Sequence, residues 1–110
     1  MTVILTTTGR KTGRPREVTL YAFEDGDRLV VVGSLGGAPR DPDWVWNLRA
    51  DPRAKVRRGR KVNEVHAHEV EGEERDRLWQ LVSKAFPLYA TYQHRTTRTI
   101  PLFVLKPESE

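Results

Sequence analysis

The alternation of apolar and polar residues in the first third of the chain predicts β-strands. Residues 3–8 are rich in β-branched side chains, and residues 16–23 alternate between two faces. Residues 28–33 form a nearly continuous apolar run, which is typical of a strand that is buried on both faces. The Asp25-Gly26 pair between these segments is a strong signal for a hairpin turn. We therefore expect three sequential strands that pair antiparallel.

The second half of the chain contains the pattern of another hairpin and a last strand. Residues 54–58 and 61–71 predict two strands that turn at Arg58-Gly59. Residues 99–105 are mostly apolar and predict a final strand, in which a proline, Pro101, indicates an edge or a bulge.

Helical periodicity appears in two segments. Residues 73–86 predict the longer helix, and Pro87 ends it. The apolar side chains at helical spacing are Leu78, Leu81, Val82, Ala85 and Phe86. A short helix is expected to begin with Asp41 or Asp43 as its cap. In that helix Trp44 and Trp46 are two residues apart, so that only one of them can face the core.

These elements predict a fold of the α+β class. The order of the elements favours a small barrel or sheet of about six mostly antiparallel strands, with one short and one longer helix packed outside. The absence of βαβ alternation and of a GxGxxG sequence argues against a dinucleotide-binding Rossmann fold. With 110 residues, we expect residues 1–110 to form a single domain.

Composition excludes several classes of chemistry. The chain has no cysteine, which rules out disulfides, cysteine-ligated metals and thiol catalysis, and which fits a reducing cytoplasm. No apolar run has the roughly 20 residues that a membrane-spanning helix needs, and no signal peptide is recognisable. The formal net charge of +4 suggests an anionic partner.

The positive charge is concentrated in two places. The first lies between residues 10 and 16, where Arg10, Lys11, Arg14 and Arg16 alternate with threonine and glycine. Guanidinium groups, hydroxyls and accessible backbone N–H groups together suit phosphate or carboxylate oxygens, although solvated surface loops are the simpler alternative. The second lies between residues 53 and 61.

Few other side chains suggest chemistry. His66 and His68 would share one face of a strand, but no third ligand is evident, and the sequence therefore predicts no metal site. Tyr89 and Tyr92 would share a face if their segment is helical, either as hydrogen-bonding phenols beside a ligand or as core residues.

Eight blocks of the chain carry a resemblance when they are taken together and in order. They are residues 5–16, 20–21, 25–27, 32–34, 36–37, 44–48, 89–93 and 98–101. This set resembles the deazaflavin-dependent nitroreductase family over nearly the whole chain. The resemblance implies a flavin-binding split β-barrel and coenzyme F420, a deazaflavin whose tail carries a phosphate and glutamates. It also implies an oxidoreductase that transfers a hydride between reduced F420 and a conjugated acceptor, a quinone or a nitro compound.

The resemblance assigns positions to the anionic tail of the cofactor. It implies that Arg10, Lys11 and Arg16 hold phosphate and carboxylate groups. Thr12 and Gly13 would add a hydroxyl and backbone donors. These five residues form the cofactor-binding loop that the resemblance implies.

The other matched positions concern the ring and the substrate. Ser34, Gly36 and Gly37 would line a second loop beside the cofactor, and Trp44 and Asn47 would close over it. The substrate side of the ring would be lined by three tyrosines: Tyr21, Tyr89 and Tyr92. Among the three, Tyr92 is favoured by the resemblance and by its chemistry. Its phenol would donate a hydrogen bond or a proton to the oxyanion that develops on the substrate.

Three departures from the family change what is expected. Leu35 stands where relatives can carry a lysine, and Val45-Trp46 replaces a common aromatic–aliphatic pair. The chain begins at the first strand without the helical extension of many members, so we expect a wider substrate pocket or a covering partner. Peripheral membrane association for a quinone substrate and a homodimer are left open.

Other functions remain as alternatives at this point. One is a carrier that binds F420 without efficient catalysis, and another is an FMN-dependent enzyme of the pyridoxamine-phosphate-oxidase type. The basic loops also raise nucleic-acid binding, but the sequence has no recognition helix and no strand typical of RNA-binding domains, which argues against it.

Overall fold

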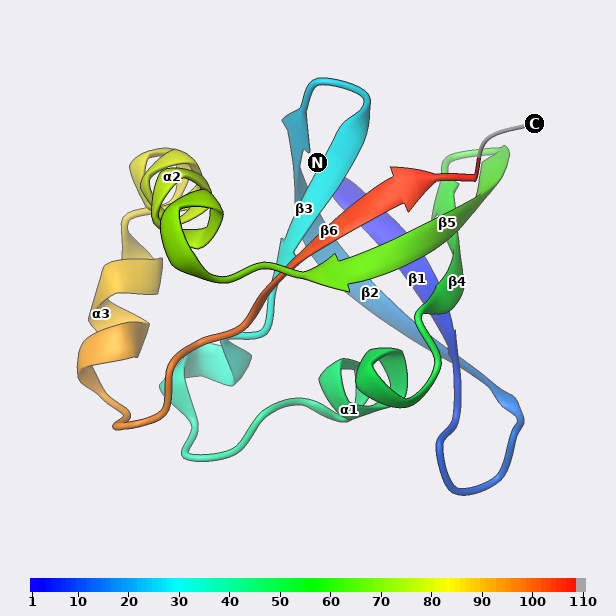
Figure 1. Ribbon diagram of the computed structural model, residues 1–110, viewed down its shortest axis with the longest axis horizontal. Coiled ribbons are helices and arrows are strands. Elements are labelled where there is room, and N and C mark those ends of the chain that lie inside the picture. The colour runs from blue at the N-terminus through cyan, green and yellow to red at the C-terminus, as the bar shows by residue number, and fades with distance from the viewer. Residues whose placement is uncertain (109–110) are drawn as a thin grey trace.

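The computed structural model describes residues 1–108, whose strands form a closed six-stranded barrel (Figure 1). The strands follow one another around the barrel in the order β1-β2-β3-β6-β5-β4, and every neighbouring pair is antiparallel. Their bounds are β1 Thr2–Thr8, β2 Pro15–Asp25, β3 Arg28–Val32, β4 Arg53–Arg58, β5 Lys61–Glu69 and β6 Leu102–Pro107. The predicted α+β class and antiparallel barrel are confirmed.

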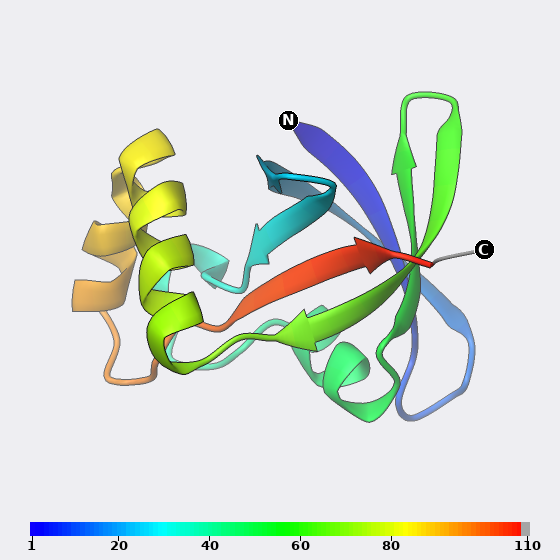
Figure 2. The ribbon, with the colours of Figure 1, turned by 45° about the horizontal axis from the view of Figure 1, so that its top comes forward.

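Helices connect the strands at two places in the described residues, between β3 and β4 and between β5 and β6. Their bounds are η1 Leu35–Gly37 (a 3₁₀ turn), α1 Asp43–Ala50, α2 Gly72–Ala85 and α3 Leu88–His94. Helices α2 and α3 lie side by side on one flank of the barrel, whereas α1 lies at the end that also carries the β1–β2 loop (Figures 1 and 2). Helix α1 is the expected short helix and α2 the expected longer one, whereas α3, which begins directly after Pro87, is a further short helix that was not expected.

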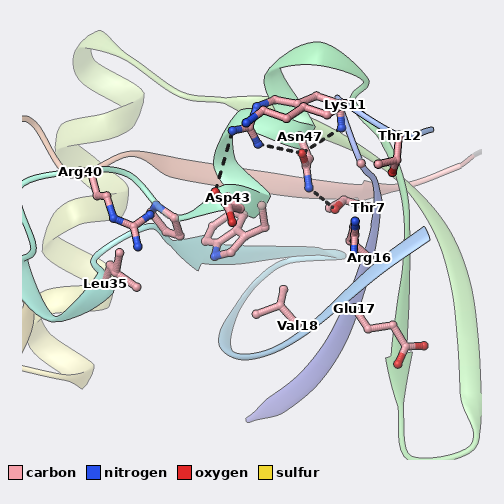
Figure 3. A pocket seen from close by; sticks show the side chains of 14 residues that line it. Thr7, Lys11, Thr12, Arg16, Glu17, Val18, Leu35, Arg40, Asp43 and Asn47 are labelled. Carbon is pink, nitrogen blue, oxygen red and sulfur yellow. Dashed lines mark hydrogen bonds and ion pairs between the residues drawn. The ribbon is translucent and has the colours of Figure 1, made fainter. Parts of the chain in front are cut away.

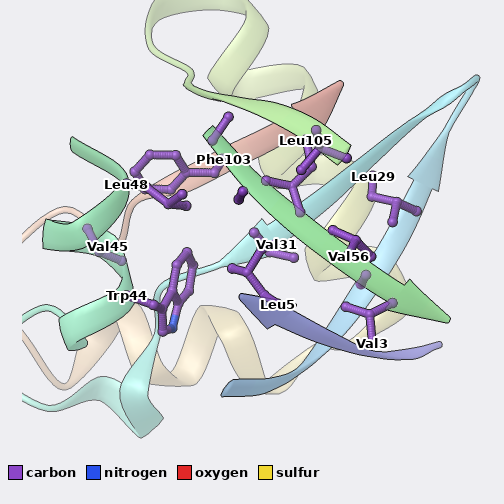
Figure 4. Close-up of a cluster of buried hydrophobic side chains, with 14 residues drawn as sticks. Val3, Leu5, Leu29, Val31, Trp44, Val45, Leu48, Val56, Phe103 and Leu105 are labelled. Carbon is purple, nitrogen blue, oxygen red and sulfur yellow. The ribbon is translucent and has the colours of Figure 1, made fainter. Parts of the chain in front are cut away.

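Apolar side chains that point into the barrel form its main core, and α1 closes this core at one end (Figure 4). Val45 and Leu48 of α1 are buried there, and the ring of Trp44 meets that of Phe103 at a centroid distance of 5.8 Å. Trp44 is 6% exposed, whereas Trp46 is 45% exposed. The prediction that only one of the two tryptophans faces the core is therefore confirmed.

A second core lies between the outside of the barrel and helices α2 and α3. Val31 of β3 points into the barrel, while Val30 and Val32 belong to the outer core together with Leu78 and Val82 of α2. Residues 29–32 of β3 are all buried because helices cover the outer face of this strand. The prediction that this apolar run forms a strand buried on both faces is therefore confirmed.

Two local expectations need correction. The residue that precedes α1 is Pro42, and neither Asp41 nor Asp43 caps the helix through its side chain. The last strand begins at Leu102, three residues later than predicted. The side chain of Gln93 replaces a strand partner there, because its Nε2 donates to the Arg98 carbonyl at 2.7 Å and its Oε1 accepts the Ile100 N–H at 2.9 Å.

Replacement of Gly33 by alanine should destabilise the fold. A Cβ atom at this position would lie 2.7 Å from Cγ of Pro101 and 2.8 Å from Cγ2 of Val45, which is closer than packed atoms allow. We expect Gly33→Ala to lower the free energy of unfolding by about 1–3 kcal/mol. Denaturant unfolding of both proteins measures this difference, and equal midpoints would contradict the close packing at Gly33.

A charged cluster connects the β2–β3 turn to α2 and predicts a pH dependence. Asp25 accepts hydrogen bonds from Arg77 at 3.0 and 3.1 Å and from Arg28, and these partners lower the pKa of its carboxyl from 3.8 to about 2. The ionised carboxylate therefore adds stability above about pH 4, and this contribution is lost as the pH falls from about 4 to 2.

Unfolding of wild type and Asp25→Asn should be compared between about pH 7 and pH 2. We expect wild type to be more stable near neutral pH, by less than about 2 kcal/mol because water screens these surface groups, and the difference to vanish near pH 2. A difference that does not change with pH would show that the Asp25 carboxylate is not held by these arginines.

Candidate functional site

A pocket of about 550 Å³ opens where the β1–β2 loop, the start of β2, the η1 loop and α1 meet (Figure 3). Three of its four cationic side chains come from the first basic segment of the sequence. Its lining residues are Thr7, Gly9, Arg10, Lys11, Thr12, Arg16, Glu17, Val18, Leu35, Arg40, Pro42, Asp43, Trp44 and Asn47.

The β1–β2 loop is folded by its own backbone. The Gly9 N–H donates to the Arg14 carbonyl and the Gly13 N–H to the Gly9 carbonyl, both at 2.8 Å. Gly13 has a φ of +71°, which favours glycine, and a Cβ on Gly9 would lie 3.0 Å from Oγ1 of Thr12. This compact loop exposes the cations that directly follow the two glycines, Arg10 and Arg14.

Asn47 connects the cationic loop to the barrel. Its side chain is 4% exposed, and its Oδ1 accepts from the backbone N–H of Arg10 at 3.1 Å and from Nη1 of Arg10 at 3.2 Å. Its Nδ2 donates to Oγ1 of the buried Thr7 at 3.2 Å. A buried amide with donors and acceptors satisfied in this way fixes the position of Arg10 at the pocket.

The pocket is positive and can accept a polyanion. Four cationic side chains line it, and only Glu17 and Asp43 oppose them. Nη2 of Arg10 lies 3.9 Å from the exposed Asp43, which is a weak surface ion pair. Guanidinium forks beside hydroxyls suit phosphate and carboxylate oxygens, and the aromatic and aliphatic wall can contact a flat ring. This set of side chains fits an anionic aromatic cofactor such as the one that the sequence resemblance implies.

Six of the predicted cofactor residues meet in this pocket: Arg10, Lys11, Thr12, Arg16, Trp44 and Asn47. Gly13 lines a neighbouring hollow of about 900 Å³ instead. Ser34, Gly36 and Gly37 belong to the η1 turn, and none of them lines the pocket. Their contribution to cofactor binding stays a prediction.

Arg40 is a pocket residue that the sequence reasoning missed. It follows Pro39 in an irregular loop and belongs to no charge cluster or motif, so no local signal identified it. The structure brings it to the pocket beside Leu35, on the wall opposite Thr12 and Arg16 (Figure 3).

The three predicted tyrosines gather in an aromatic cluster on the outside of the barrel. Tyr89 and Tyr92 lie on α3 with ring centroids 6.3 Å apart, and Phe23 lies 5.9 Å from Tyr89 and 5.3 Å from Tyr21. None of the tyrosines lines the pocket. Gly37 brings the cluster next to the η1 loop, since a Cβ there would lie 2.8 Å from the Tyr92 carbonyl.

The phenols of these tyrosines differ in environment. Tyr89 is 6% exposed, and its burial, followed by the nearby phenols of Tyr92 and Tyr21, raises the pKa of its hydroxyl to about 12. Tyr21 is 57% exposed and Tyr92 is half-buried. A buried phenol of raised pKa is a poorer acid, which leaves Tyr92 and Tyr21 as the more accessible proton donors.

The remaining candidates lie away from the pocket. His66 and His68 are exposed on one face of β5, as the sequence predicts. No helix among residues 1–108 is both long and apolar enough to cross a membrane.

Comparisons with known proteins identify the family of the chain. The family model described as F420H(2)-dependent quinone reductase matches residues 1–107. A protein of Mycobacterium tuberculosis (strain H37Rv) named F420H(2)-dependent quinone reductase is 42% identical over 106 residues, which cover 94% of this chain and 71% of that protein.

Two solved structures match equally well, each with a TM-score of 0.87 and 42% identity over 96% of this chain. One is described as an F420-H2 dependent reductase, of which the match covers 93%, and the other as a domain-swapped dimer, of which it covers 79%. The resemblance seen in the sequence is confirmed, and coenzyme F420 is the cofactor of this chain. The chain belongs to the family of F420H(2)-dependent quinone reductases, which are F420-dependent oxidoreductases.

Proposed function

We propose that the chain holds coenzyme F420 in the pocket beneath the β1–β2 loop and reduces a quinone beside the tyrosine cluster. The observation that carries this proposal is the convergence of four cationic side chains around a buried Asn47 that anchors one of them. The cofactor supplies hydride chemistry when it is bound. The protein has to bind it, orient it and provide a proton.

The β1–β2 loop binds the anionic tail in this proposal. Arg10, Lys11 and Arg16 neutralise phosphate and carboxylate oxygens, and the hydroxyl of Thr12 donates a hydrogen bond to them. The role of Gly13 stays a prediction, because its N–H donates to the Gly9 carbonyl and it lines the neighbouring hollow. Asn47 keeps Arg10 at the pocket through two hydrogen bonds and so acts on the tail through the arginine. Ser34, Gly36 and Gly37 stay predictions as contacts of the cofactor, because they flank Leu35 in the η1 turn and do not line the pocket.

The tyrosine cluster provides the proton in this proposal. The hydroxyl of Tyr92 can donate a proton, or a hydrogen bond, to an oxygen that becomes negative on reduction of the quinone. Tyr89 supports the ring of Tyr92 from the core, and Tyr21 covers the cluster from β2. A hydride plus one proton reduces a quinone to a hydroquinone, and the tyrosinate left on Tyr92 recovers its proton from water.

The partners of the chain remain to be tested. Peripheral membrane association, a homodimer and a location in the cytoplasm stay predictions. Phe86 and Leu88 are 36% and 47% exposed at the α2–α3 corner beside Tyr92, which supports approach of an apolar substrate from this side. That the chain does not bind nucleic acid is also a prediction.

Oxidation of reduced F420 by a soluble benzoquinone or naphthoquinone tests the proposed function. The absorbance of oxidised F420 should appear at a rate that is proportional to enzyme and saturates with quinone. Binding of F420 without turnover of any quinone or nitro compound would favour the carrier alternative. Tighter binding of FMN than of F420 would favour the flavin alternative.

A further inference from the structure

Arg98 contacts four acceptors along one loop, residues 33–41. Its Nε donates to the Ala38 carbonyl at 2.8 Å, and its Nη2 donates to the Ser34 carbonyl at 2.8 Å. Its Nη1 donates to the Gly33 carbonyl at 3.2 Å and to Oδ1 of Asp41 at 2.7 Å. Only the planar fork of an arginine can reach acceptors on three sides in this way.

Asp41 extends the contact to the barrel. Its other oxygen, Oδ2, accepts from Arg49 of α1 at 3.0 Å, and Arg49 also pairs with Glu69 of β5 at 2.8 Å. The side chains of Arg98 and Asp41 are 14% and 13% exposed, so water screens this ion pair less than those at the surface. The pair therefore joins the loop to both α1 and the residues before β6.

The loop that Arg98 holds is strained. Leu35 has a φ of +44°, a left-handed conformation that costs a residue with a side chain about 1–2 kcal/mol. Such a residue keeps its conformation only where the surrounding structure enforces it, and strain of this kind is concentrated at functional sites. The carbonyls on either side of Leu35, those of Ser34 and Ala38, are two of the acceptors of Arg98.

The same loop forms the wall of the pocket that faces the β1–β2 loop. Leu35 and Arg40 are its two lining residues on that wall (Figure 3). Within residues 1–108, Arg40 has no carboxylate at ion-pair distance, so its charge is available to a ligand. Its neighbour Asp41 is engaged with Arg98 and Arg49, which leaves Arg40 to face the pocket.

We propose that Arg98 is a positioning residue for cofactor binding. Together with Asp41 it holds Leu35 in its strained conformation and presents the charge of Arg40 to the pocket, without touching the cofactor itself. This inference rests on the proposed function, because it assigns the pocket to F420. Without Arg98 the loop would occupy several conformations. The affinity for F420 would then fall with the fraction of molecules whose loop is competent to bind.

Arg98→Lys tests the inference, with Arg28→Lys as the matched control. Lysine keeps one positive charge near Asp41 but cannot bond three carbonyls as well. Arg28 also pairs with two acids, yet it lies at the β2–β3 turn away from the pocket. Three quantities are measured for each protein: the unfolding midpoint, the hydrogen exchange of the amides of residues 34–41 without cofactor, and the Kd for F420 by fluorescence titration.

We expect Arg98→Lys to speed exchange in residues 34–41 and to raise the Kd about tenfold, as when about a tenth of the molecules remain competent. Arg28→Lys should change neither quantity, even if it lowers the midpoint. In the Arg40→Ala background, Arg98→Lys should raise the Kd by a smaller factor.

Two results would overturn the positioning role. One is a Kd within about twofold of wild type for Arg98→Lys together with faster exchange, which would make Arg98 a purely structural residue. The other is a weaker Kd with unchanged exchange, which would mean that Arg98 does not act through the loop. If wild type itself fails to bind F420, the proposed function is wrong as well, whereas wild-type binding with either of these results contradicts only the role of Arg98.

Discussion

Replacement of both Arg10 and Lys11 by alanine should weaken the binding of F420 about 100-fold. A hydrogen bond to a charged group contributes about 1.5–3 kcal/mol, and the loss of two at the lower end corresponds to two orders of magnitude in Kd. The fold should survive, because the backbone N–H of Arg10 still donates to Asn47 and the loop glycines keep their own hydrogen bonds. Fluorescence titration with F420 measures the Kd.

The salt dependence of the same titration separates the tail-binding role from a general effect of charge. Binding to wild type should weaken as salt increases, and binding to the double variant should depend on salt less steeply. The matched control is Arg60→Ala with Lys61→Ala, which removes the same net charge at the exposed β4–β5 turn. An equal loss of affinity in this control would contradict a specific role for Arg10 and Lys11.

Tyr92→Phe should reduce kcat by about 100-fold while the Kd for F420 stays within about twofold of wild type. Phenylalanine keeps the ring that packs near Phe86 and Tyr89 and removes only the hydroxyl. Steady-state oxidation of reduced F420 by a quinone gives kcat, and titration gives the Kd. This combination of results is expected of a group that acts in the transition state.

Tyr89→Phe is the matched control, because Tyr89 is buried and this burial raises the pKa of its phenol. It should lower kcat much less than Tyr92→Phe does. If Tyr92→Phe lowers kcat and weakens F420 binding in parallel, Tyr92 is a packing residue. If Tyr89→Phe has the larger effect on kcat, the proton comes from the buried phenol instead.

The strands were predictable from the sequence because their signal is local. The alternation in residues 16–23, the apolar run of residues 28–33 and the Asp25-Gly26 turn each reflect contacts between neighbours on one strand or across one hairpin. Helix α3 was not predicted as an element, since its seven residues are too few for a clear apolar period. The true start of α1 was missed because Asp41 binds arginines instead of the helix end.

In the site, too, local patterns were predictable from the sequence and long-range contacts were not. The cationic loop was predictable because its charges, hydroxyls and glycines are consecutive in the chain. Arg40 reaches the pocket only through the tertiary path of its loop, and Arg98 contacts carbonyls 60 to 65 positions earlier in the sequence. No periodicity or spacing encodes contacts at this separation.

The measurement that tests the account most directly compares two ligands that share one ring system. F420 and the same deazaflavin without its phosphate and glutamates are titrated against the wild-type chain at low and at moderate salt. We predict that intact F420 binds at least about 100-fold more tightly at low salt, and that this advantage shrinks as salt is added. Equal affinity for the two ligands, or an advantage that salt does not change, would contradict the claim that the β1–β2 loop holds the anionic tail.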